Sequence, residues 1–135
     1  MSVQRNEAMP GSILIIEDDR ALRDELVELA GALGAAVIGV ANGDDARRAC
    51  EQMPFSLILC DYKLQAETGL EVLKTLRLRH QSAPPPIIYL MTGHLDLTTA
   101  ARQQIDDATD GLLMKPVRSS ELRNLILSSG SPASC

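Results

Sequence analysis

Ser-Ile-Leu-Ile-Ile-Glu-Asp-Asp, residues 12–19, joins an unbroken aliphatic run directly to three acidic side chains. Such a run is typical of a strand that is covered on both faces, as in a parallel sheet. From Leu22 onward, leucines recur at helical spacing until Gly34, which is placed to end a helix. Asp19 is expected to be the N-cap of that helix. The stretch therefore predicts a buried strand that passes, through acidic residues, straight into a helix.

The same succession of strand and helix repeats along the chain. The later strands are expected at Ala36–Val40, Leu57–Cys60, Ile87–Met91 and Leu112–Met114, and the later helices from Asn42 or Gly43 to Pro54 and at Gly69–Arg79, Leu97–Ala108 and Glu121–Leu127. Ser119 or Ser120 is expected to cap the last helix. This alternation predicts an α/β fold with a parallel sheet and right-handed crossovers. We expect one domain at residues 12–127, between disordered segments at 1–11 and 128–135.

Composition excludes several classes of protein. A chain of 135 residues suits a single hydrophobic core. The formal net charge of −5 argues against nucleic-acid binding by this domain alone. Three cysteines without a CxxC pair argue against a disulfide framework and favour a reducing, cytoplasmic location. There is no signal-peptide pattern and no apolar run long enough to span a bilayer, so no membrane partner is expected.

Polar residues stand where the expected strands end. Glu17 and Asp18 follow the first strand, and Asp61, Thr92 and Lys115 follow the third, fourth and fifth. In a parallel α/β sheet these ends meet at one crevice. Three carboxylates there would repel one another unless a cation were bound, and oxygen ligands suit Mg²⁺. A nearby hydroxyl and ammonium suit phosphoryl transfer, in which a central carboxylate could attack phosphorus to give an acyl phosphate.

Four motifs in this order resemble the response-regulator receiver family over about residues 12–127. They are Ile-Leu-Ile-Ile-Glu-Asp-Asp from Ile13, Leu-Ile-Leu-Cys-Asp-Tyr-Lys-Leu from Leu57, Thr-Gly at Thr92, and Leu-Met-Lys-Pro from Leu113. The resemblance implies a flavodoxin-like (βα)5 doubly wound sheet in strand order 2-1-3-4-5. It also implies a cis peptide bond between Lys115 and Pro116.

The resemblance also assigns roles to individual residues. Asp61 would accept the phosphoryl group, assisted by Thr92 and Lys115. The ligands of Mg²⁺ would be the side chains of Glu17, Asp18 and Asp61 and the backbone carbonyl of Lys63. The phosphoryl donor would be a histidine kinase or a phosphotransfer protein. Because the sequence ends shortly after the last expected helix, we expect output through altered protein–protein contacts, or a longer parent protein.

Two features depart from the family pattern. Leu112 stands three positions before Lys115, where the family often has an aromatic residue that acts as a switch. We therefore expect the segment 93–110 to carry the conformational change instead. The loop after Asp61 lacks the Met-Pro of many members, and with the Met-Lys-Pro-Val near the end it resembles receivers attached to hybrid sensor kinases.

Other readings remain open at this stage. The chain could be a pseudo-receiver that binds a partner without phosphorylation, although that predicts loss of site residues, and none is lost. It could be a small aspartyl-phosphate phosphatase, but Lys63 stands where that chemistry usually has a second acid. We therefore expect no enzyme activity beyond its own phosphoryl transfer and dephosphorylation. Cys60 is expected to be a buried packing residue, and Glu67 a solvated loop charge.

Overall fold

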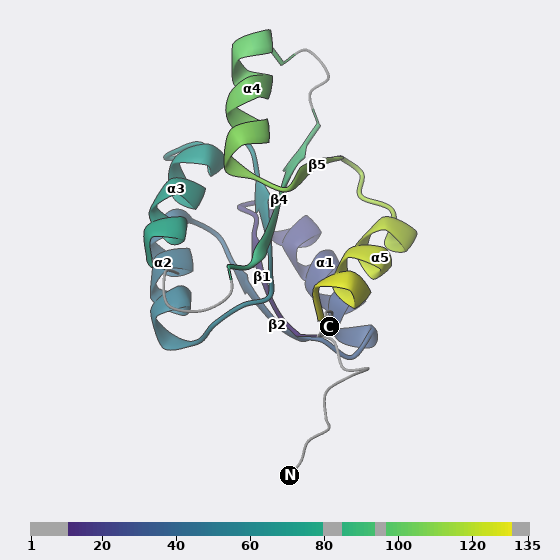
Figure 1. Cartoon of the computed structure of the whole chain (residues 1–135). Coiled ribbons are helices and arrows are strands. Elements are labelled where there is room, and N and C mark those ends of the chain that lie inside the picture. The colour runs from purple at the N-terminus through teal and green to yellow at the C-terminus, as the bar shows by residue number, and fades with distance from the viewer. Residues whose placement is uncertain (1–10, 80–84, 94–96, 131–135) are drawn as a thin grey trace.

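The molecule is a five-stranded sheet with helices packed on both faces (Figure 1). The computed structural model describes residues 11–79, 85–93 and 97–130. All four strand pairings are parallel, and the strand order is β2-β1-β3-β4-β5. The predicted fold class and strand order are both confirmed.

Strands and helices alternate along the chain as predicted. The strands are β1 (Ser12–Ile16), β2 (Ala36–Val40), β3 (Leu57–Asp61), β4 (Ile87–Thr92) and β5 (Gly111–Met114). Within the described residues, the helices are α1 (Arg20–Ala32), α2 (Gly43–Gln52), α3 (Gly69–Arg79), α4 (Thr99–Ala108) and α5 (Ser119–Gly130). None of these helices has the length and apolar character that a bilayer crossing requires.

The sheet separates two aliphatic layers. Along β1, Leu14 and Ile16 join the layer beneath α2, α3 and α4, whereas Ile13 and Ile15 join the layer beneath α1 and α5. Figure 1 shows α2 and α3 on one side of the sheet and α1 and α5 on the other. All four of these β1 side chains are fully buried. The unbroken aliphatic run is therefore explained by burial on both faces of a central strand.

Side-chain caps fix where three helices begin. Asp19 accepts a hydrogen bond from the backbone N–H of Leu22, which confirms the predicted cap of α1. Asn42 does the same at α2, with Asp45 as donor. Thr98 caps α4, so this helix begins at Thr99 and not at Leu97 as expected from the apolar pattern.

The last helix differs from its expected bounds at both ends. It begins at Ser119, where the Glu121 carboxylate accepts a hydrogen bond from the N–H of Arg118, so neither serine precedes the helix as a cap. It continues to Gly130, so residues 128–130 are helical and do not belong to a disordered tail. Leu122 and Ile126 bury one face of the helix in the layer shared with α1, within the part of the helix that was expected. The segments 1–10 and 131–135 lie outside the described residues.

Two glycines hold positions that a side chain would disturb. Gly34 has a φ of 93°, the left-handed conformation expected of a residue that ends a helix. Gly69, at the start of α3, packs against β3 so closely that an added Cβ would collide with the backbone carbonyl of Asp61 and lie 2.8 Å from Leu90 Cδ2. The first turn of α3 is thus pressed directly against the end of the central strand.

We predict that Gly69→Ala lowers the free energy of unfolding by roughly 1–3 kcal/mol, because the backbone beside Asp61 must shift to admit a methyl group. The matched control is Gly31→Ala in α1, where an added Cβ would meet nothing within 4 Å. Removing that helical glycine should be neutral or stabilising by up to about 1 kcal/mol. Urea denaturation measures both, and equal stability of the two variants would contradict the tight approach at Gly69.

Candidate functional site

The sheet order brings the predicted site residues to one edge. β1 and β3 are neighbours with Ile16 opposite Cys60, so Glu17 and Asp61, the next residues, leave the two strands side by side. β4 and β5 lie on the other side of β3 and end at Thr92 and Met114, which are opposite each other. The crevice therefore has Asp61 at its centre, between the acidic end of β1 and the ends of the last two strands.

Three carboxylates converge in this crevice. One oxygen from each of Glu17, Asp18 and Asp61 lies within 4.8 Å of the others. Glu17 is 1% exposed and Asp61 6% exposed, while Asp18 is half-buried. The crevice thus holds a compact group of oxygen ligands that is accessible on the Asp18 side.

Lys115 bridges two of the three carboxylates. Its Nζ lies 2.9 Å from Glu17 Oε1 and 3.1 Å from Asp61 Oδ1. Burial alone would lower the pKa of Lys115, but the hydrogen bonds to Glu17 and Asp61 outweigh that effect and raise it. The side chain therefore stays a cation pointed at the central aspartate. The Lys115–Pro116 bond is cis, as the family resemblance implied.

Glu17 is held in a fixed orientation by the start of α1. Its Oε2 accepts a hydrogen bond from the N–H of Asp19, and its carbonyl accepts one from Arg23. Its Oε1 is buried, and the Lys115 ammonium 2.9 Å away offsets its charge. Burial raises the pKa of Glu17, and the contact with Lys115 opposes that rise. This buried oxygen has capacity for a further positive partner.

The donor set fits a hard divalent cation. One ammonium among three ionised carboxylates leaves two negative charges uncompensated. The ligands are all oxygens, and the Asp18 side is open enough for coordinated water. Mg²⁺ prefers this combination of few carboxylates and retained water. The geometry thus agrees with the metal that the sequence predicted.

Thr92 and Lys63 border the crevice. Thr92 is the last residue of β4 and is 1% exposed, and its carbonyl accepts a hydrogen bond from the N–H of Lys115 at 2.8 Å. Lys63 lies in the loop between β3 and α3, two residues after Asp61, and is exposed. The role of its carbonyl as a metal ligand stays a prediction. The two histidines of the sequence, His80 and His94, lie outside the described residues.

Cys60 is a packing residue, as predicted. Its side chain is fully buried, and burial raises the pKa of the thiol well above its usual value. The expectation for Glu67 is wrong: its side chain is 26% exposed and forms an ion pair with Arg47 at 3.2 Å. Glu67 has this partner because α2 runs beside α3 and brings Arg47 to a loop that is distant in the sequence (Figure 1).

Sequence reasoning also missed how α3 begins. Thr68 Oγ1 accepts a hydrogen bond from the N–H of Glu71, and the Glu71 carboxylate accepts one from the N–H of Thr68. This reciprocal pair is a capping box. The signal was present, because a threonine followed three residues later by glutamate before an apolar run is its sequence pattern. The capping box fixes the point at which the chain leaves the crevice.

The comparisons with known proteins agree with this site. The family model of the response regulator receiver domain matches residues 13–127. The transcriptional regulatory protein FixJ of Bradyrhizobium diazoefficiens is 35% identical over 119 residues, covering 86% of this chain and 55% of FixJ. Regulator of RpoS from Escherichia coli strain K12 is 30% identical over 115 residues, covering 84% of this chain and 33% of that protein. The chain thus spans about half of the first relative and a third of the second.

Solved structures share the fold as well. A CheY-like response regulator receiver domain from Methylobacillus flagellatus is 25% identical with a TM-score of 0.74, covering 89% of this chain and 98% of that one. The signal receiver domain of a modulated diguanylate cyclase from Desulfovibrio desulfuricans is 27% identical with a TM-score of 0.72, covering 90% and 93%. A closer kinship with receivers of hybrid kinases stays a prediction. With its acidic crevice, its bridging lysine and a family match over residues 13–127, the protein belongs to the response regulator receiver domains of two-component systems.

Proposed function

We propose that Asp61 accepts a phosphoryl group from the phosphohistidine of a histidine kinase or phosphotransfer protein, in a Mg²⁺-dependent reaction. The observation that carries this proposal is the placement of Asp61. Its carboxylate and that of Glu17 both pair with the Lys115 ammonium, and one of its oxygens lies within 4.8 Å of an oxygen of Glu17 and of Asp18. An isolated strand-end aspartate would need neither arrangement. The downstream effect is a change in protein–protein contacts, and we expect the domain to act in the cytoplasm.

The chemistry follows from the positions of the groups. A carboxylate oxygen of Asp61 attacks phosphorus and forms a P–O bond. The P–N bond to the donor imidazole breaks, its electron pair stays on the imidazole nitrogen, and the product is an acyl phosphate. Lys115 places a positive charge beside the position that the phosphoryl oxygens would take, and the Thr92 hydroxyl would donate a hydrogen bond to one of them. The residues that would hold Mg²⁺ are Glu17, Asp18, Asp61 and the carbonyl of Lys63. The metal would supply charge neutralisation at the same oxygens.

The two other readings gain less support. A phosphatase that acts on external substrates needs an acid to protonate the leaving group, and the position two residues after Asp61 holds the exposed Lys63. A pseudo-receiver needs no acidic cluster, yet Glu17 is held buried beside Lys115 at an energetic cost that binding to a partner elsewhere would not require. Under the proposed function, the domain therefore catalyses only its own phosphorylation and dephosphorylation.

We predict that Asp61→Asn abolishes the phosphoryl adduct formed with acetyl phosphate and Mg²⁺, because the amide cannot act as the nucleophile. Intact mass spectrometry measures the gain of one phosphoryl group. Asp45→Asn, which changes a half-buried aspartate in the first turn of α2 that pairs with Arg48, is the control and should keep full labelling. Labelling of Asp61→Asn at the wild-type level would refute the assignment.

A second prediction concerns the metal. Asp18→Asn should weaken Mg²⁺ binding at least severalfold, because it removes a ligand charge from a weak, hydrated site. Asp24→Asn in α1 removes an exposed carboxylate away from the crevice and should leave binding unchanged. Titration of backbone amide shifts with Mg²⁺ measures both affinities. The acidic crevice is not the metal site if the two variants bind Mg²⁺ equally well.

The structure also bears on how phosphorylation could be transmitted. Leu112 packs in the layer beneath α2, α3 and α4, and being aliphatic it has no polar tip to exchange between crevice and surface. α4 has a single buried side chain, Ile105. This helix is the next element in the chain after β4, which ends at Thr92. Few buried contacts mean that local opening of this helix costs little.

We therefore predict that phosphorylation changes amide hydrogen exchange most in residues 93–110, as Thr92 is drawn toward the phosphoryl group. Exchange measured before and after acetyl phosphate treatment tests this, with Asp61→Asn as the unphosphorylated control. A change confined to residues 36–53, or no change in a labelled sample, would contradict this route of transmission.

A further inference from the structure

The loop between β3 and α3, residues 62–68, is closed at its base by the backbone. The N–H of Gly69 donates to the carbonyl of Tyr62 at 2.8 Å, and Lys63 forms an isolated antiparallel bridge with Thr68. The N–H of Tyr62 donates to Met91 on β4 at 2.7 Å. These contacts fix where the loop starts and ends, and Leu64 packs against the hydrophobic core, but residues 65–67 are left to be positioned by something else.

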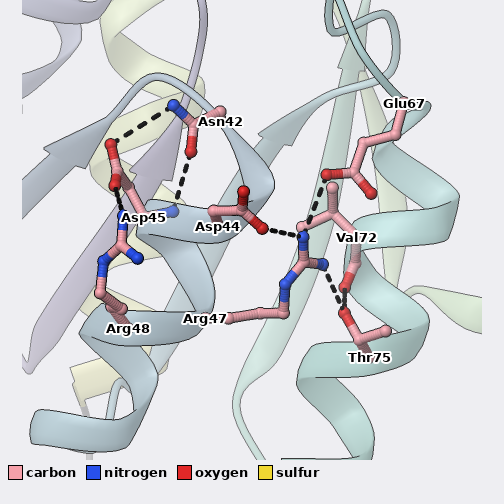
Figure 2. A network of polar contacts seen from close by, with 8 residues as sticks. All are labelled: Asn42, Asp44, Asp45, Arg47, Arg48, Glu67, Val72 and Thr75. Carbon is pink, nitrogen blue, oxygen red and sulfur yellow. Dashed lines mark hydrogen bonds and ion pairs between the residues drawn. The ribbon is translucent and has the colours of Figure 1, made fainter.

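Arg47 is that second attachment (Figure 2). From α2, its Nη2 reaches Glu67 Oε2 at 3.2 Å, and its Nη1 donates to Thr75 Oγ1 on α3 at 3.0 Å. Thr75 in turn donates to the carbonyl of Val72 at 2.7 Å, which leaves its oxygen oriented to accept from Arg47. Asp44 completes the set at 2.9 Å from Nη2. One guanidinium thus joins the loop to two helices.

The neighbouring pair on the same helix has no such reach. Arg48 contacts Asp45 at 2.6 Å, three residues earlier on α2, and its side chain is 68% exposed. The side chain of Arg47 is only 20% exposed. Two adjacent arginines of equal charge therefore differ in burial and in reach, and of the two it is Arg47 that spans from α2 to the loop and α3.

The contacts of Arg47 with Glu67 and Thr75, here called the Arg47 clasp, lie beside the open side of the metal site. A hollow of about 380 Å³ is lined by Asp18, by residues 41–44 at the start of α2 and by residues 64–67 of the loop. Glu67 is the residue of the loop wall that pairs with Arg47, so the pair joins the loop to the helix whose first residues form the other wall. The loop also carries Lys63, whose carbonyl is a proposed metal ligand.

We propose that Arg47 is a positioning residue, which holds the β3–α3 loop in the arrangement that Mg²⁺ binding at Asp61 requires. The inference rests on the proposed function. A loop that is already ordered loses less conformational entropy when its carbonyl binds a metal. Without the clasp, that ordering must occur on binding and lowers the affinity. Arg47 touches neither the metal nor the phosphoryl group and acts only through Glu67 and Thr75.

Charge and positioning predict opposite results for Arg47→Met. Removing a cation near an acidic site should, by electrostatics alone, strengthen Mg²⁺ binding. Losing the clasp should instead weaken it by roughly threefold to tenfold, the scale of a partly exposed charged hydrogen bond. Arg48→Met removes the same charge from the next residue and reports the electrostatic effect alone. It should bind Mg²⁺ as well as the wild type or slightly better.

Mg²⁺ titration followed by amide shifts measures these affinities without any phosphoryl donor. Amide exchange in residues 63–68 of the metal-free protein should become faster in Arg47→Met and remain unchanged in Arg48→Met. Excess Mg²⁺ should recover most of the rate of labelling by acetyl phosphate in Arg47→Met. If Arg47→Met binds Mg²⁺ with unchanged or higher affinity, or if Arg48→Met weakens binding equally, Arg47 does not position the loop.

A second pair of variants keeps the test open if Arg47→Met does not fold. Glu67→Gln neutralises the loop end of the clasp, whereas Asp44→Asn neutralises the other carboxylate that touches the same Nη2 but belongs to α2. Both changes remove one negative charge beside the hollow. Glu67→Gln should accelerate loop exchange and weaken Mg²⁺ binding more than Asp44→Asn. Equal effects of the two would overturn the proposal.

The outcome is separable from that of the proposed function. If wild-type protein gains no phosphoryl group, the assignment of Asp61 fails, but the effect of Arg47 on metal affinity and loop exchange can still be observed. If wild-type protein is labelled and the Arg47 and Arg48 variants behave alike, the phospho-acceptor stands and only the clasp is wrong.

Discussion

Carboxylates at the ends of two adjacent strands repel one another, and most of the site follows from how that repulsion is contained. At separations of 3–5 Å and an effective dielectric constant of about 20, each pair of unit charges interacts by roughly 3–6 kcal/mol. One ammonium, from Lys115, attracts Glu17 and Asp61 on this scale and cannot also neutralise Asp18. The side chain of Lys115, the residue that follows β5, therefore has to reach past the end of β4 to the end of β3. The negative charge that it leaves unbalanced suits a divalent cation.

The sequence predicted the sheet and the carboxylate crevice well because both depend on local patterns. Aliphatic runs ending in Glu17, Asp61 and Thr92 mark strands and the side chains at their ends, and parallel topology then brings those ends together. The start of α4 was misplaced because Leu97 continues the apolar pattern, although Thr98 supplies the cap. The end of α5 was misplaced because serines carry little helical signal, yet the helix continues to Gly130.

Contacts between distant residues could not be predicted in the same way. Arg47 and Glu67 are twenty positions apart, and Arg47 and Thr75 are twenty-eight apart. Each is an ordinary polar residue on a helix or loop, and no motif joins them. Their pairing depends on α2 and α3 lying side by side on the same face of the sheet, a consequence of chain crossovers that only the folded structure shows. Glu67 was read as a solvated charge for that reason.

The two flanks of Asp61 differ in how firmly they are held, and this difference decides which flank moves when Asp61 is phosphorylated. On the β1 and α2 side, the loop is fixed by the capping box at Thr68, by the close approach of Gly69 and by the Arg47 clasp. On the β4 and β5 side, α4 is anchored by the single buried side chain of Ile105. A charge placed on Asp61 would strain both flanks, and displacement follows the softer one. Under the proposed function, a firm flank serves metal binding while a loose flank is left to report the phosphoryl group. The β3–α3 loop must therefore keep its position while α4 moves. If the loop moved as well, the metal ligands would be displaced whenever α4 changed its conformation.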